Sequence, residues 1–379
     1  MRLNTLAAAT VAGLLGATPV LADLVFPSLS YRTGPYAAGG IPFADGYADY
    51  FTLLNERDGG IGGVAARVLE CETAYNTEKG VECYESTKGE GALVYQPLST
   101  GITYQLIPKA SADGIPLHTM GYGRTSAANG SVFEWVFNYP ANYWNGASHA
   151  INHILDENGG DVAGKRVALV YHNSAYGKEP IRTLEELSAA NIRFPMENFI
   201  GVWWSGSEND VLPAGAGADG YKSLNMHNVG ADFPIYDDLK THVVDKGLAA
   251  GAGDQLGTVL YNRGLYAAML AAEAARTAQG IHGVGEITAA MMRDGMEALE
   301  ITEARMGELG MPNFGPSFSV SCDNHGGPGL GAVQQWDASA ESWSLITDFY
   351  ASDMEVIQPL ITADSEAYAA EAGIEPRGC

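Results

Sequence analysis

Residues 92–110 read ALVYQPLSTGITYQLIPKA, and this stretch decides the fold class. Residues 92–98 form a continuous apolar run, which is typical of a strand buried on both faces of a parallel sheet. A Ser-Thr-Gly turn at 99–101 ends the run, and residues 102–110 return to helical periodicity. A buried strand followed at once by a helix predicts one β-α unit of an α/β protein.

The same alternation of strands and helices continues in both directions along the chain. Before and after this unit, strands are expected at 23–29, 64–70 and 116–120, and helices at 41–55 and 79–88. A strand at 133–137 leads into a second series, with helices at 142–157, 180–190, 235–244, 256–278 and 287–299, strands at 166–172, 199–204 and 221–226, and a β-hairpin at 332–336 and 342–349. We therefore expect an α/β protein of two doubly wound parallel-sheet lobes.

Composition limits the classes of partner. The chain has 379 residues, too many for one ordinary domain and suited to two. It carries 21 Lys and Arg against 45 Asp and Glu, a net charge of −24. Such an acidic chain repels phosphate backbones and anionic membrane surfaces, so we expect neither nucleic acid nor membrane lipid as a partner.

The N-terminus has the features of a secretory signal peptide. One positive charge at Arg2 precedes an apolar run at 6–15, and Thr18-Pro-Val-Leu-Ala22 provides a break and a small-residue cleavage site. No later run reaches the ~18 apolar residues that span a bilayer. We predict cleavage after residue 22 and release into the periplasm.

The four cysteines fit export to an oxidising compartment. Four cysteines allow three pairings. We favour Cys71 with Cys83 as a local staple and Cys322 with Cys379 as a tether for the C-terminus. The spacing that zinc sites need does not occur among them.

Five loops that follow predicted strands share hydroxyls, glycines and aromatic rings. They are 31–36, 99–101, 121–125, 173–176 and 203–207. Ligands bind beyond the carboxyl ends of parallel strands, where hydroxyls and helix N-termini hold a carboxylate and aromatic rings enclose an apolar body. The loops therefore predict a cleft, although N-capping by Ser99 and Thr100 and core packing of Trp203 and Trp204 would explain single loops equally well.

Catalytic and metal motifs are mostly missing. A G-x-G-x-x-G match at 215–220 precedes a strand, so it does not indicate a dinucleotide site. His149 and His153 lack the intervening Glu of a zinc motif and are expected to be exposed or capping. Glu72 is the one acid that merits attention. We expect no metal and no cofactor.

The order of several short motifs resembles one family. They are Thr33-Gly-Pro-Tyr-Ala-Ala-Gly39, Asn55-Glu-Arg-Asp-Gly-Gly-Ile-Gly-Gly63, Cys71-Glu-Thr73, Ser99-Thr100 and Tyr176-Gly177. Over nearly the whole exported chain this order resembles type I periplasmic solute-binding proteins, in particular the Leu/Ile/Val receptor branch of ABC importers. The resemblance implies a monomeric, non-enzymatic receptor that closes two lobes around a small solute and delivers it to membrane permease subunits.

The resemblance also implies the ligand contacts. Ser99 and Thr100, with the backbone of Gly121 and Gly123, would hold a carboxylate or an equivalent group, and Tyr176 would close over the solute. Together with the loop aromatics Tyr36, Tyr122 and Trp203 they make up the predicted site. Trp203 stands where amino-acid receptors place an acid for the ammonium group, which favours an aromatic or neutral solute.

A second departure from the family concerns the second lobe. Relatives place an additional β-α unit, about 20 residues or more, between the helix after Tyr176 and the strand ending at Trp203. Here residues 190–199 form only a short connector. The second lobe is therefore expected to have a smaller sheet or a damaged ligand wall.

The predicted domains follow from these assignments. Residues 1–22 are the signal peptide, 23–137 with 257–315 form the N-terminal lobe, and 138–256 with 316–379 form the C-terminal lobe. Closure would be a hinge motion at the crossings near 137, 257 and 315. Two alternatives remain, a sensory receptor of the same fold and an exported hydrolase that uses Glu72 and another carboxylate.

Overall fold

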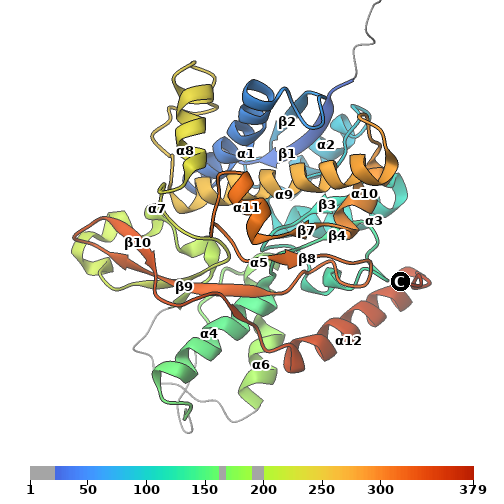
Figure 1. Ribbon diagram of the computed structural model, residues 1–379. Helices are drawn as coiled ribbons and strands as arrows, with labels where there is room; N and C mark the ends of the chain where they lie inside the picture. Colours follow the sequence, from blue (N-terminus) through green and yellow to red (C-terminus); the bar gives the residue numbers. More distant parts are fainter. Residues whose placement is uncertain (1–21, 162–167, 190–199) are drawn as a thin grey trace, which may run out of the picture.

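The computed structural model describes residues 22–161, 168–189 and 200–379, and Figure 1 shows strands with helices packed around them. The predicted signal peptide lies outside these residues except for its last, Ala22. We call the strands between residues 24 and 137, with their helices, the first lobe, and the sheet formed by strands within 200–225 and 330–351, with its helices, the second lobe. The domain boundaries predicted at 137, 257 and 315 stay a prediction.

The first lobe is built on parallel strands. β1 (Leu24–Ser30) pairs with β2 (Ala66–Glu72), and β3 (Leu117–His118) pairs with β4 (Val136–Phe137). The predicted strand at 92–98 lies between β1 and β3, but only as isolated bridges. Pro27 in β1 has no N–H to offer this neighbour, which interrupts the ladder.

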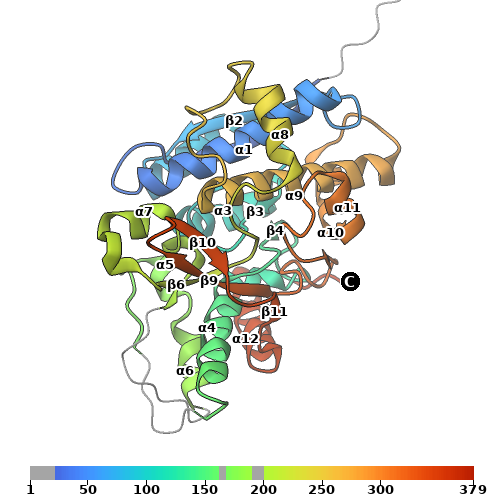
Figure 2. The same cartoon turned by 60° about the vertical axis from the view of Figure 1, so that its left-hand side comes forward.

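Helices cover this sheet, and glycines let two of them approach closely. α1 (Ala37–Asp58) lies beside α9 (Val259–His282) in both views (Figures 1 and 2). A Cβ on Gly264 would lie 2.0 Å from the Phe43 carbonyl oxygen, so only glycine allows this spacing. The other helices and short elements associated with this lobe are α2 (Thr77–Thr87), α3 (Thr100–Asp113), η1 (Thr125–Ala128), α8 (Pro234–Leu239), η4 (Lys240–Val244), α10 (Ala289–Glu297), β7 (Glu300–Ile301), α11 (Glu303–Glu308) and β8 (Phe318–Ser319).

The second lobe has a mixed sheet. Its strand order is β10-β9-β6-β5, with β11 also paired to β9. The parallel pair is β5 with β6, whereas β9 runs antiparallel to β6 and forms the predicted hairpin with β10. The strands are β5 (Ile200–Gly201), β6 (Lys222–Asn225), β9 (Leu330–Asp337), β10 (Ser342–Leu345) and β11 (Tyr350–Ala351), and the helices are α4 (Tyr143–Glu157), α5 (Ala175–Lys178), α6 (Ile181–Ala189), η2 (Trp203–Ser205), α7 (Glu208–Val211), η3 (Leu212–Ala218) and α12 (Met354–Ala372).

The strand predicted at 166–172 is wrong for its described part. Residues 168–172 form no strand, and Val170 is 85% exposed. A strand needs a neighbour for its backbone N–H and C=O groups, and β5 is the last strand of the sheet in the described part of the chain. The connector at 190–199, on which the predicted shortage of one β-α unit rests, lies outside the described residues, so the shortage stays a prediction.

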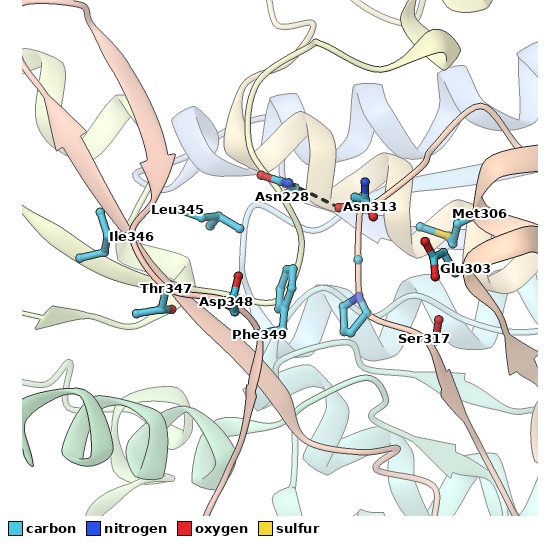
Figure 3. A pocket seen from close by; sticks show the side chains of 12 residues that line it. Asn228, Glu303, Met306, Asn313, Ser317, Leu345, Ile346, Thr347, Asp348 and Phe349 are labelled. Carbon is cyan, nitrogen blue, oxygen red and sulfur yellow. Dashed lines mark hydrogen bonds between the residues drawn. The ribbon is translucent and has the colours of Figure 1, made fainter. Parts of the chain in front are cut away.

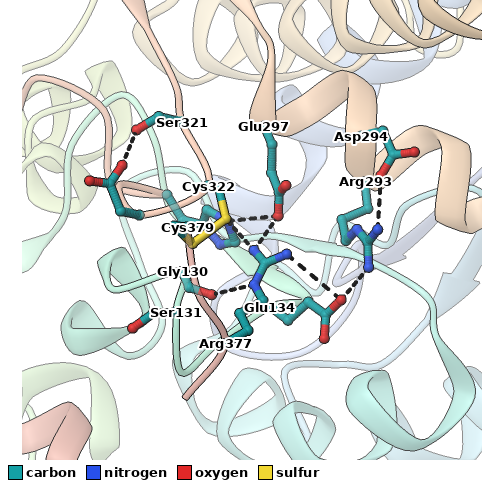
Figure 4. Close-up of polar contacts among 12 residues, drawn as sticks. Gly130, Ser131, Glu134, Arg293, Asp294, Glu297, Ser321, Cys322, Arg377 and Cys379 are labelled. Carbon is teal, nitrogen blue, oxygen red and sulfur yellow. Dashed lines mark hydrogen bonds and ion pairs between the residues drawn. A yellow bond between two sulfur atoms is a disulfide. The ribbon is translucent and has the colours of Figure 1, made fainter.

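Both predicted disulfides are present. Cys71 is joined to Cys83, and Cys322 to Cys379. Beside the second bond, Arg377 donates from Nε to the Gly130 carbonyl oxygen at 3.1 Å and pairs with Glu297 (Figure 4). The bond and the ion pair together fasten the last residues to the first lobe.

No helix within the described ranges is both long and apolar enough to cross a membrane.

Candidate functional site

The predicted site begins at the N-terminus of α3. Ser99 is the N-cap, and its hydroxyl accepts a hydrogen bond from the Ile102 N–H at 3.4 Å. Thr100 is fully buried, and its hydroxyl accepts from the Gly123 N–H at 3.2 Å. The strand-turn-helix pattern of the sequence therefore places both hydroxyls at the sheet edge where ligands bind.

The loop at 121–123 closes against the second lobe. Gly121 and Gly123 have φ values of +74° and +85°, a region that favours glycine. The Gly121 carbonyl oxygen accepts hydrogen bonds from Trp203 Nε1 at 2.6 Å and from Trp204 Nε1 at 2.9 Å. The Tyr122 hydroxyl accepts from the Leu98 N–H at 2.8 Å. The loop and both indoles thus join the two lobes.

Tyrosines surround the two hydroxyls. On the second lobe, Tyr143 lies 5.5 Å from Tyr176 and 6.2 Å from Trp203 between ring centroids. Burial raises the pKa of Tyr143 well above its ordinary value, although a hydrogen bond with Thr100 acts in the opposite direction. On the first lobe, Tyr75 lies 4.9 Å from the Tyr31 ring. These phenols stay neutral at physiological pH and present a polar, aromatic wall.

Tyr36 lies at the rim of this wall. Its side chain is 42% exposed, and its hydroxyl is 3.0 Å from His172 Nε2 in the second lobe. Its ring also contacts Tyr75, at 4.8 Å between centroids. We call the whole group the interlobe site, which comprises Tyr31, Tyr36, Tyr75, Ser99, Thr100, Gly121, Tyr122, Gly123, Tyr143, Tyr176, Trp203, Trp204 and Arg263. The structure therefore brings all eight predicted ligand residues into one region.

Arg263 is a member of the interlobe site that was not among the predicted site residues. It is fully buried in α9, where Nη1 donates to the Trp203 carbonyl oxygen and Nη2 donates to Asn225 Oδ1 at 3.0 Å. Its guanidinium lies 5.0 Å from the Trp204 ring centroid, and burial lowers its pKa to about 9. Helix α9 is apolar on all sides, and an arginine within such a helix is the sequence signal that would have identified Arg263 as a site residue.

A cavity of about 310 Å³ borders the interlobe site. Arg124, Trp144 and Ala175 in its wall are direct chain neighbours of Gly123, Tyr143 and Tyr176 in the site. The other lining residues are Tyr104, Thr125, Ser126, Lys178, Glu179, Arg182 and Asp364. The buried Glu179 carboxylate accepts from the Tyr104 hydroxyl at 2.5 Å and from the Thr125 N–H at 3.4 Å. Burial raises the pKa of Glu179 to about 7. The volume is at the lower end of the range for small-molecule pockets.

A second hollow, of about 720 Å³, contains none of the predicted residues. Figure 3 shows residues 345–349 on one side and Glu303, Met306 and Asn313 on the other. The Asn228 side chain donates to the Asn313 carbonyl oxygen at 3.4 Å across it. We assign the site to the smaller cavity and the interlobe site, because their hydroxyls, aromatic rings and cations converge.

Glu72 does not have the environment of a catalytic acid. Burial alone would raise its pKa, but hydrogen bonds from the Arg32 and Ala74 N–H groups and the Thr33 hydroxyl outweigh burial and lower it. The carboxylate therefore holds the turn after β2 and stays ionised.

The prediction that His149 and His153 are exposed or capping is wrong. Both are buried, because α4 packs its histidine-bearing face against β9, where Gly331 leaves room for the His149 ring. Burial lowers the pKa of His149 to about 4. No cluster of potential metal ligands occurs among the described residues.

Comparison with known proteins gives consistent matches. Residues 25–193 match the family model described as periplasmic binding protein. A crystal structure described as an ABC transporter permease from the Pseudomonas fluorescens group is 35% identical with a TM-score of 0.87, over 94% of this chain and 99% of that one. A search of curated proteins found no match.

More distant structures share the fold. A branched chain amino acid ABC transporter protein from Thermus thermophilus, with bound valine, is 17% identical with a TM-score of 0.70, over 88% of this chain and 97% of that one. A solute binding protein from Rhodopseudomonas palustris HaA2, in complex with p-hydroxybenzoic acid, is 10% identical with a TM-score of 0.64, over 88% and 98%.

Proposed function

The chain belongs to the type I periplasmic binding protein family, and from this premise we propose that it is the periplasmic substrate-binding component of an ABC importer. In this role it closes two lobes around a small solute and delivers the solute to membrane permease subunits. Members of the family bind substrates and are not enzymes, and we assign no chemical step to this chain. We also propose that it is exported by its N-terminal signal peptide and acts as a monomer.

One observation carries the proposal. The Gly121 carbonyl oxygen of the first lobe accepts hydrogen bonds from Trp203 and Trp204 of the second lobe. The contact lies at the carboxyl ends of the strands, where an α/β sheet binds its ligands. A receptor that works by closure needs polar and aromatic groups from both lobes at this place.

The chemistry of the site favours an aromatic or apolar solute with one polar head. Tyr143, Tyr176 and Trp203 supply flat ring surfaces from the second lobe. Thr100 and the N-terminus of α3 supply hydroxyl and N–H groups from the first lobe. Rings on one side and polar groups on the other suit an amino acid, an amide or an aromatic carboxylate.

The test is a binding panel on the protein purified from the periplasm of a secreting host. Branched-chain amino acids, short amides, urea and aromatic carboxylates are added one at a time, and the melting temperature is recorded. A solute at about 100 times its Kd stabilises the folded protein by roughly 2.7 kcal/mol, which raises the melting temperature clearly.

Closure is measured on the same samples by small-angle X-ray scattering. We expect one solute class to raise the melting temperature and to reduce the radius of gyration. Thr100→Val, which removes one site hydroxyl, should weaken that binding, whereas Thr362→Val on the exposed face of α12 should not. A cooperative melt without a shift for any solute would contradict the proposed function.

A further inference from the structure

The Lys and Arg side chains without a carboxylate partner gather in one region of the described structure. In the described part, most Lys and Arg side chains form ion pairs with Asp or Glu. Those without an ion pair or hydrogen bond to an acid are Lys79, Lys178, Arg182 and Arg263. All but Lys79 belong to the interlobe site or to the cavity beside it. With 45 acids for 21 bases, this grouping is unexpected.

Arg263 is the deepest of these cations. Its side chain has no exposed surface, and its Nη atoms donate only to neutral oxygens, those of the Trp203 carbonyl and the Asn225 amide. Its Nε–H has no acceptor in the structure. A buried guanidinium that makes no hydrogen bond to a carboxylate is costly, and a buried unpartnered N–H adds to that cost.

The nearest acids do not neutralise this charge directly. Glu208 acts on Arg263 through space, but its carboxylate oxygens accept from the Val259 N–H at 3.2 and 3.1 Å and cap α9. Asp210 accepts from the N–H and the hydroxyl of Ser207 at 2.9 and 2.7 Å. Both carboxylates accept hydrogen bonds from other groups, and neither is hydrogen-bonded to the guanidinium.

The surroundings of Arg263 define the rest of the ligand. Tyr31 and Tyr143 interact electrostatically with the guanidinium, and the Trp204 ring lies against it. Lys178 and Arg182 follow Tyr176 by two and six positions and lie at the cavity beside the site. These two cations attract an anion to the cavity, and the Arg263 Nε–H beside the aromatic wall has no acceptor.

We propose that the solute is a monoanion, a carboxylate on an aromatic or apolar body, and that Arg263 is the residue that selects it. The inference rests on the proposed function and names the substrate class of the same site. A buried guanidinium with an N–H that has no acceptor suits the two oxygens of a carboxylate. A zwitterionic amino acid would also need a free carboxylate for its ammonium group, and both acids nearest Arg263 are engaged in capping.

The experiment compares acids with their matched amides. Benzoate with benzamide, phenylacetate with phenylacetamide, and phenylalanine as the zwitterion are titrated calorimetrically into the full exported protein at pH 7.5. We expect at least one acid to bind about 10- to 100-fold more tightly than its amide, the range that charge-assisted hydrogen bonds give. Arg263→Gln should abolish this preference.

Arg276→Gln is the matched control, since Arg276 lies on the same helix and pairs with Glu273 away from the site. This variant should keep the preference. If Arg263→Gln does not fold, Arg263→Lys retains the charge and should retain a weaker preference, and the acid–amide comparison on the wild-type protein needs no variant.

Two further outcomes separate this inference from the proposed function. Binding of an amide or of phenylalanine as tightly as the acids, or an unchanged preference in Arg263→Gln, overturns the inference and leaves the importer role intact. Failure of every acid to bind overturns the inference, and the absence of any shift in the wider solute panel then contradicts the importer role as well.

Discussion

Glu179 should make the stability of this protein fall as the pH rises from 4.5 to 7. The residue follows α5 in the second lobe, yet its carboxyl group bonds Tyr104 and Thr125 of the first lobe. Burial is the main cause that raises its pKa from the ordinary 4.5 to about 7, and Asp364 adds to the increase, whereas the Tyr104 hydrogen bond opposes it. The folded protein therefore keeps a proton that the unfolded chain gives up.

The sign and size of the pH dependence follow from this difference between the folded and unfolded pKa values of Glu179. Below pH 4.5 both states are protonated, and the stabilising effect of the raised pKa is fully present. Between pH 4.5 and 7 the unfolded chain ionises first, so the free energy of unfolding decreases as the pH rises. Above pH 7 the loss is complete at about 3 kcal/mol, since each pKa unit corresponds to about 1.4 kcal/mol.

Glu179→Gln removes the titration and keeps an acceptor for Tyr104. The free energy of unfolding, measured by urea denaturation from pH 4.5 to 8, should increase relative to wild type by about 3 kcal/mol across this range. The buried histidines titrate equally in both proteins and cancel in the difference. Glu366→Gln, at an exposed position on α12, should show no such trend. A difference between the wild type and the Glu179→Gln variant that stays constant with pH would refute the burial of an ionisable carboxyl group between the lobes.

Three further predictions concern packing and cross-links. Gly264→Ala should lower the free energy of unfolding by about 1–3 kcal/mol in urea denaturation, because the new Cβ would meet the Phe43 carbonyl oxygen. Gly280→Ala on the same helix has open space around the new Cβ and should be neutral or stabilising. Under non-reducing conditions Cys322→Ser should lower the free energy of unfolding by about 2–4 kcal/mol. This loss should exceed that of Cys71→Ser, because the Cys322–Cys379 bond spans 57 residues and the Cys71–Cys83 bond spans 12. Equal losses would contradict the loop-entropy argument. Trp203→Phe should cost about 1 kcal/mol through the lost bond to the Gly121 carbonyl and should weaken solute binding, and calorimetry that finds unchanged affinity would remove Trp203 from the site.

Local patterns were sufficient for most of the fold. The apolar run and hydroxyl turn at 92–101 located the start of α3 and the edge of the first sheet, because caps and buried strands depend on neighbouring residues. Helix α12 was missed, although Asp353 caps its first turn and Gly373 ends it in a left-handed conformation. The strand predicted at 166–172 shows the limit of such patterns, since residues 168–172 have strand-like composition but no partner strand in the described sheet.

The lobed α/β class, the favoured disulfide pairs and the loops that carry the interlobe site could be predicted from residue patterns, because each depends on spacing along the chain. Which side chains meet across the two lobes became visible only in the folded protein. Arg263 lies 60 positions from Trp203, and Glu179 lies 75 positions from Tyr104. Burial is the main cause of both pKa shifts, and the Arg263 guanidinium is left without a hydrogen bond to a carboxylate. Desolvation depends on everything that packs around a group, and no local pattern records it.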